Sequence, residues 1–226
     1  MLTTHLRSPK VIGLLGAVVL AALVVLAVRE SVIRRQARAL PPLAVDLAPA
    51  RVRELREQIA EQEAIIRAKP QDFSAYTTLA LARTELGDRD GAAEVYRTMN
   101  QRFPGNYLSF QNLGKLYEDA EKYAFAAEQY LIAIENAPRI AQMYRNVVNL
   151  YTYRDTERAA DIPRILQKGL AVMPGSIDLM AMMAVYYRDH GDPAEAIKWY
   201  ELLLVHDQTN TTALEELKAL KAQITK

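Results

Sequence analysis

The side chains that could perform chemistry are few in this sequence and lie far apart. The chain has no cysteine, which excludes disulfides, thiolate nucleophiles, cysteine-based zinc sites and iron–sulfur clusters. Its three histidines, His5, His190 and His206, have no second histidine at metal-binding spacing. We therefore expect each of them to be a solvated side chain.

Two short stretches come near to known ligand-binding loops and fail in specific ways. The stretch from Gly105 to Gly114-Lys115 has the wrong interval for a phosphate-binding loop and lacks the Ser or Thr that should follow. Asp88 to Gly91 misses the third ligand and the closing Glu of a calcium loop, so it is interpreted as a turn. The sequence thus offers no catalytic, cofactor-binding or metal-binding residue, and we expect no enzyme and no cofactor.

Charge is divided unevenly along the 226 residues, although the net charge is only +1. Residues 1–40 hold six Lys and Arg against one acidic residue, and the rest holds 22 basic against 26 acidic residues. A mildly acidic body has no basic stripe that could follow a phosphate backbone, so nucleic acid is not an expected partner.

Residues 11–28 form an uninterrupted apolar run of eighteen residues behind a short basic tail, residues 1–10. As a helix this run would measure about 27 Å, close to the hydrocarbon thickness of a bilayer. The run is longer than the usual core of a secretion signal, and basic residues follow at once. We therefore expect a single-pass membrane helix that contacts the lipid bilayer. The alternative is a cleaved signal, because Val25-Leu26-Ala27 offers small residues to a signal peptidase.

The flanking charges leave the orientation of this span open. Four arginines follow it, whereas Arg7, Lys10 and the amino terminus precede it, so the positive-inside rule does not decide. A short basic tail is hard to translocate, which favours an extracytoplasmic body on a bacterial inner or plasma membrane over a cytoplasmic one. Gly13, Ala17 and Ala21 form a stripe of small residues that would allow self-association through the span.

A pattern with a period of 34 residues begins at Tyr76. Each unit of the pattern begins with a large residue and ends with a proline. Between them, small and large residues are expected to face each other across a tight turn. Such a period is typical of stacked helix–turn–helix units. The matching pairs are Tyr76 and Phe110, Leu79 and Leu113, Ala80 and Gly114, Ala92 and Ala126, Tyr96 and Tyr130, Met99 and Ala133, and Pro104 and Pro138.

The pattern divides the body into a linker, an entry helix, four repeats and a last helix. Glycine stands at the turns of repeats one and four, whereas repeat two has Glu121 there. Repeat three has two extra residues in a turn near 153–160, after which Asp161 is expected to cap the next helix. The stripe on the entry helix is interpreted as the last helix of an incomplete leading repeat rather than a coiled-coil seam. The segments are 29–49 (juxtamembrane segment and proline-containing linker), 50–210 (repeat domain, with entry helix 50–69 and repeats 73–106, 107–140, 141–176 and 177–210) and 211–226 (capping helix).

These residues make the chain resemble tetratricopeptide repeat (TPR) proteins over about residues 51–226. The resemblance implies an all-α fold, a right-handed α-solenoid of about four helix pairs plus capping helices, preceded here by one transmembrane helix. It also implies a non-catalytic scaffold that binds peptide or helical segments of partner proteins in a concave groove. The N-terminal anchor is similar to that of membrane-attached bacterial members, including some that assist cytochrome c assembly.

If the family's geometry holds, the first helix of each repeat lines the groove. Arg145 and Asn149 match one helix of the cluster with which some members clamp a terminal carboxylate, but Met182 and Thr212 stand where its partners should be. We therefore expect no carboxylate clamp. The implied groove residues are Thr77, Leu81 and Thr84, then Gln111, Lys115 and Glu118, then Arg145, Asn149 and Tyr153, then Ala181, Val185 and Arg188.

The primary hypothesis is thus a membrane-anchored scaffold that assists assembly of a membrane-associated complex. The alternative is a soluble, secreted or periplasmic chaperone-like module released by signal cleavage.

Overall fold

The computed structural model describes residues 9–224, except for the side chains of residues 9–18, 21–22 and 34–35. The regular secondary structure of this part of the chain is entirely helical, with no strand. It divides into two units, residues 1–39 and 40–226. The helices are α1 (Pro9–Arg38), α2 (Pro49–Ala68), α3 (Phe73–Glu85), α4 (Arg89–Arg102), α5 (Tyr107–Asp119), α6 (Tyr123–Asn136), α7 (Ala141–Tyr153), the 3-10 helix η2 (Thr156–Asp161), α8 (Ile162–Val172), α9 (Ile177–Asp189), α10 (Pro193–His206) and α11 (Thr211–Ile224).

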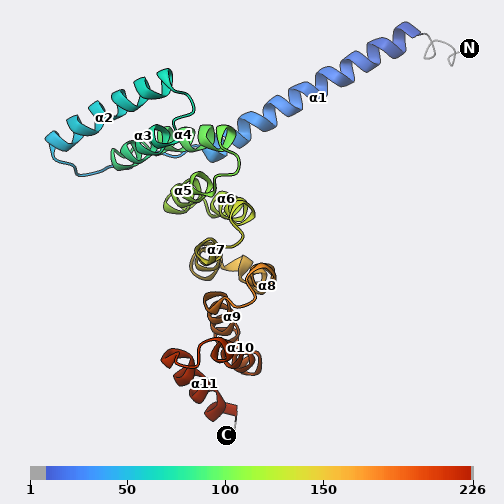
Figure 1. Ribbon diagram of the computed structural model, residues 1–226. Helices are drawn as coiled ribbons and strands as arrows, with labels where there is room; N and C mark the ends of the chain where they lie inside the picture. Colours follow the sequence, from blue (N-terminus) through green and yellow to red (C-terminus); the bar gives the residue numbers. More distant parts are fainter. Residues whose placement is uncertain (1–8, 225–226) are drawn as a thin grey trace, which may run out of the picture. The chain divides into compact units, whose positions relative to one another are not determined.

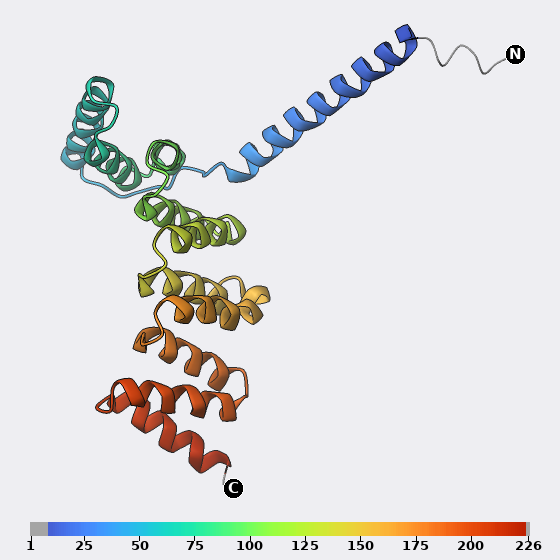
Figure 2. The same cartoon turned by 45° about the vertical axis from the view of Figure 1, so that its right-hand side comes forward.

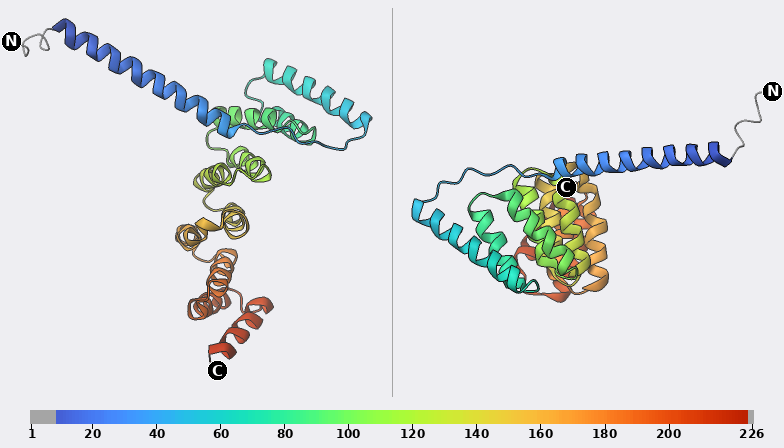
Figure 3. Two further views of the ribbon diagram at one scale, coloured as in Figure 1. Left: turned by 180° about the vertical axis from the view of Figure 1, so that it is seen from behind. Right: turned by 90° about the horizontal axis from the view of Figure 1, so that it is seen from above.

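The second unit is a stack of antiparallel helix pairs, as Figures 1 and 2 show. Helices α3 to α10 form four pairs, and the second helix of each pair packs against the first helix of the next. Viewed from above, the pairs lie over one another (Figure 3). The expected all-α repeat array is confirmed, because each pair buries its apolar faces within itself and against its neighbours.

Within repeat two, a small residue of the first helix packs against a tyrosine of the second. Gly114 lies so close to the ring of Tyr130 that a Cβ atom would come within 2.6 Å of it. Ala80 and Tyr96 are buried at the matching positions of repeat one. The facing small and large residues of the sequence pattern are therefore core residues, as are Met180, Met183 and most of the repeated tyrosines.

Short polar side chains begin several of the helices. An oxygen of each accepts a hydrogen bond from a backbone N–H in the first turn, which would otherwise lack a partner. Asp72, Asp88, Asn106, Ser176 and Asp192 act in this way. Asp161 does not cap α8 as expected; its carboxylate accepts a hydrogen bond from Arg164 instead. Asp161 is the last residue of η2, the 3-10 helix that accommodates the extra residues of repeat three.

The turns within repeats one, two and four each contain a residue in the left-handed region. Gly87 has φ 83° and Gly191 has φ 76°, whereas the non-glycine residue Glu121 has φ 58°. A side chain with a Cβ atom is strained in this region, whereas glycine is not.

We predict that Glu121→Gly raises the free energy of unfolding by about 1 kcal/mol, because it relieves this strain. Chemical denaturation followed by circular dichroism measures the change. Lys122→Gly, one residue later at a negative φ, is the matched control and should not stabilise the chain. Equal stabilities of Glu121→Gly and the wild type would contradict this account.

Helix α2 and the segment before it cover the start of the stack. Leu55, at the centre of the α2 apolar stripe, is fully buried, and α2 packs against α3. The segment Leu40–Val45, part of the predicted proline-containing linker within 29–49, is docked on the turn between α3 and α4. Leu40 is only 2% exposed, its N–H donates to Asp90, and the N–H of Leu43 donates to the carbonyl of Gly87 over 2.9 Å.

Helix α1 belongs to the first unit and extends to Arg38, beyond the predicted span. The predicted span, residues 11–28, includes side chains outside the described part, at 11–18, 21 and 22. Those described between Val19 and Val28 are apolar and exposed, and each large one is 54–65% exposed. A search of the described residues finds no helix that is both long and apolar enough to cross a membrane.

Helix α11 closes the described part of the stack and packs against α10. Ala213 and Leu220 are buried and Leu217 is partly buried, so one face of α11 contributes to the core. Leu214, which lies one 34-residue period after the buried Met180, is 47% exposed.

Candidate functional site

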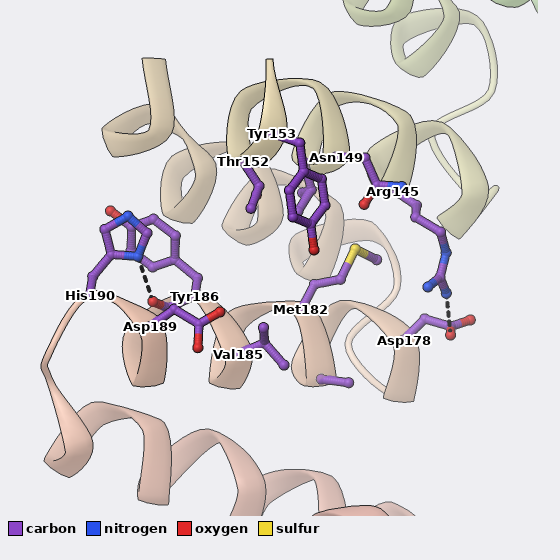
Figure 4. A pocket seen from close by; sticks show the side chains of 12 residues that line it. Arg145, Asn149, Thr152, Tyr153, Asp178, Met182, Val185, Tyr186, Asp189 and His190 are labelled. Atoms are coloured by element: carbon purple, nitrogen blue, oxygen red, sulfur yellow. Dashed lines mark hydrogen bonds and ion pairs between the residues drawn. The ribbon is translucent and has the colours of Figure 1, made fainter. Parts of the chain in front are cut away.

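A cavity of about 260 Å³ lies between α7 and α9, the first helices of repeats three and four. The two helices contact each other directly, so residues from both can contribute to one site. Figure 4 shows the side chains of α7 above and those of α9 below. The lining residues are Arg145, Val148, Asn149, Thr152 and Tyr153 from α7, and Asp178, Ala181, Met182, Val185, Tyr186, Asp189 and His190 from α9 and its end.

Aromatic rings form one end of the cavity. The ring of His190 stacks on Tyr186, with centroids 4.1 Å apart and planes 22° from parallel. His190 Nδ1 lies 2.8 Å from the carbonyl oxygen of Tyr186, which can only accept, so Nδ1 carries the hydrogen. Opposite them, Tyr153 extends from α7 towards Met182 and is 72% exposed (Figure 4). These rings leave aromatic surface open to a ligand.

The other end is polar but already paired. Arg145 donates a hydrogen bond to Asp178 over 2.8 Å, and the two side chains connect α7 to α9. Asn149 lies between the two ends, exposed and able both to donate and to accept. Because Arg145 already has a carboxylate partner, it is poorly placed to receive a terminal carboxylate.

The structure gathers five of the predicted groove residues in this cavity. Arg145, Asn149, Tyr153, Ala181 and Val185 all line it. Arg188 does not; its guanidinium lies between Asp189, at 2.8 Å, and Glu216 of α11, at 2.6 Å.

The predicted groove residues of repeats one and two do not line this cavity, and most bond within their own repeat. The hydroxyls of Thr77 and Thr84 donate to carbonyl oxygens four residues earlier in α3. Lys115 forms an ion pair with Asp119 over 2.8 Å, and Glu118 accepts a hydrogen bond from Tyr130 over 2.7 Å.

The two remaining predicted residues offer unpaired surface. Leu81 is 54% exposed on α3, and Gln111 is half-buried on α5. The predicted groove residues of repeats one and two thus lie on α3 and α5, outside the cavity between α7 and α9.

Ion pairs shift the pKa values of several groups on the first helices of the repeats. Hydrogen bonding to Asp119 raises the pKa of Lys115, and the nearby charge of Arg154 opposes that shift. Asp189, and to a smaller extent Glu216, raises the pKa of Arg188. Arg51 of α2 lowers the pKa of Glu85 by donating to its carboxylate. These pairs keep the groups charged at neutral pH.

Sequence reasoning missed the contribution of the last turn of α9. It treated His190 as a solvated turn residue and did not consider Tyr186 or Asp189. The spacing of Tyr186 and His190, four residues apart on a helix, was the signal available, because such residues lie on one face.

The cavity has features of a binding site for a polypeptide segment. Val148, Met182 and Val185 line the cavity and can accept an apolar side chain, and Asn149 can bond to a backbone amide. In the described part of the chain, no three carboxylate or imidazole groups gather closely enough to hold a metal ion.

Comparison with known proteins gives the fold. No family model matches the chain. Tetratricopeptide repeat protein 37 of Xenopus laevis is 25% identical over 112 residues, which are 50% of this chain and 6% of that protein. The chain therefore spans only a small part of this curated relative.

Two solved structures have a similar fold. The crystal structure of MamA has a TM-score of 0.53 and 15% identity, and the match covers 75% of this chain and 99% of that one. YrrB, described as a TPR protein with an unusual peptide-binding site, has a TM-score of 0.51 and 13% identity, over 73% of this chain and 84% of that one. The chain thus folds as a TPR-like array of helix pairs.

Proposed function

We propose that this protein is a non-catalytic scaffold that binds a segment of a partner protein, and that the cavity between α7 and α9 is the centre of its binding surface. The cavity itself is the observation that supports this proposal. Its open aromatic surface, apolar lining residues and exposed amide suit a polypeptide. A TPR-like fold with a peptide-binding site in YrrB is in keeping with the proposal.

Selection of short random peptides on the full chain tests it. We expect the enriched peptides to bind the wild-type chain with about micromolar affinity. Their affinity for the Asn149→Trp variant should be at least about tenfold lower, because the indole fills an exposed position in the cavity. Gln167→Trp on α8 is the matched control, because Gln167 is exposed and does not line the cavity. No enrichment, or equal losses in both variants, would overturn the proposal.

We further propose that residues 11–28 attach the scaffold to a membrane, with the repeat domain on the extracytoplasmic side. The uninterrupted apolar run and the exposed apolar side chains of α1 support this. Such a scaffold would hold partners near a bilayer during assembly of a complex. The alternative, a released soluble module, rests on the small residues near Ala27.

Mass spectrometry of the native protein, together with an alkaline wash of the membrane fraction, separates the two alternatives. An intact N-terminus on protein that stays in the washed membranes is the expected result. A mature chain that begins at Val28 would contradict membrane attachment and favour the released module. A proximity-labelling tag at Lys226 then reports the side of the membrane.

A further inference from the structure

The first helix of each repeat ends in a carboxylate residue, except in repeat three. Glu85, Asp119 and Asp189 end α3, α5 and α9 with a carboxylate, and each is bonded to a neighbouring basic side chain. At the matching position of α7 stands Tyr153, whose ring lines the cavity and is 72% exposed. Repeat three thus replaces a carboxylate by an open aromatic face, directly opposite the end of α9.

The side chains at this end of α9 carry an excess of negative charge. Arg188 is the single cation between Asp189 and Glu216, so one positive charge meets two negative charges. The Arg145–Asp178 pair at the other end of the cavity is neutral. Arg154, which follows Tyr153, does not line the cavity, and its charge acts on Lys115 of α5.

The backbone adds to this negative potential. Thr152, Tyr153, Asp189 and His190 lie at the carboxyl ends of α7 and α9, so the negative ends of two helix dipoles lie at one end of the cavity. A cation near the carboxyl end of a helix is stabilised by the helix dipole. Tyrosine rings also attract a cation over their faces.

We propose that the aromatic end of the cavity binds a basic side chain, Lys or Arg, of the partner segment, while Val148, Met182 and Val185 contact an apolar residue beside it. This deepens the proposed function, on which it rests. The cation would lie between Tyr153 and Tyr186, near the Asp189 carboxylate. Complementary charge and open rings select this occupant over an acidic or neutral one.

Three synthetic peptides test the preference. They are identical, blocked at both ends, and hold a leucine beside a central Lys, Gln or Glu. Fluorescence anisotropy on the full chain should show the Lys peptide binding about fivefold more tightly than the Gln peptide, and the Glu peptide most weakly. The difference should shrink as salt is added, because ions screen an exposed charge.

Variants assign the preference to this end of the cavity. The Asp189→Asn variant should bind the Lys peptide no more tightly than the Gln peptide. Tyr153→Leu should lower the affinity for the Lys peptide about fivefold and the affinity for the Gln peptide by less. Asp119→Asn removes the same charge from the last residue of α5 and is the matched control, expected to change nothing.

The outcomes separate this inference from the proposal on which it rests. Equal or tighter binding of the Gln or Glu peptide, still lost with Asn149→Trp, would overturn the basic preference and leave the binding surface in place. A Lys preference that Asp119→Asn removes as fully as Asp189→Asn would also overturn it. Failure of every selected and synthetic peptide to bind would overturn both.

Discussion

Leu55→Ala is expected to release α2 from the repeat array. The substitution should lower the free energy of undocking α2 by about 3 kcal/mol. Leu55 is the one residue of α2 that is fully buried, and no other α2 side chain is as well placed to replace it. The truncation removes apolar contact and leaves a cavity against α3. Hydrogen exchange of the full chain measures the effect, because the α2 amides should lose protection while those of α9 and α10 keep it.

Leu81→Ala is the control for this prediction. It removes the same atoms from a side chain of α3 that is 54% exposed, so its effect should stay within about 0.5 kcal/mol. If α2 kept its protection in Leu55→Ala, the helix would be held mainly by its ion pairs, Arg51 with Glu85 and Glu63 with Arg83, and our account of its packing would be wrong.

Gly114→Ala is expected to lower the free energy of unfolding by about 2 kcal/mol. The new Cβ would lie 2.6 Å from two carbon atoms of the Tyr130 ring, which is itself buried and cannot move away without disturbing α6. Alanine normally stabilises a helix by about 1 kcal/mol relative to glycine. A lower free energy of unfolding would therefore show that the steric overlap with Tyr130 costs more than this stabilisation. Thermal unfolding followed by circular dichroism measures it.

Gly105→Ala is the matched substitution, because nothing lies within 4 Å of the position of its Cβ. It should leave stability unchanged or slightly raised. The comparison with repeat one is informative, since Ala80 already occupies the position equivalent to Gly114 there. A Gly114→Ala variant more stable than the wild type would mean that Tyr130 leaves room for a Cβ atom at position 114, contrary to the structure.

The helix pairs could be predicted from the sequence because the 34-residue period records the core directly. Gly114 facing Tyr130 and Ala80 beside Tyr96 are core positions in both the pattern and the structure. Periodic burial has a clear sequence signal, because the same contacts recur at the same offsets.

The docked segment before α2 has no such signal. Leu40 and Leu43 are isolated apolar residues near two prolines, and their positions depend on a backbone carbonyl at Gly87 and on Asp90, about fifty residues away. Contacts of this kind arise from tertiary structure, so no local pattern predicts them.

The candidate site was predicted in part. Asn149 and Val185, which the offsets of the family pattern indicate as groove residues, both line the cavity and lie in the regular middle of a first helix. The offsets missed Tyr186 and His190, whose role depends on stacking in the last turn of α9. They also give no sign that Lys115 of repeat two is paired with Asp119 of its own helix, because that pairing depends on side-chain conformation.

Hydrogen exchange of the full chain with and without a selected Lys-containing peptide tests the central claim most directly. The account predicts slower exchange in α7 and α9, greatest near Tyr153 and Tyr186, and little change in α8 and α10 on the other side of each pair. Protection confined to α8 and α10, or spread over α3 to α6 with none in α7 and α9, would contradict it.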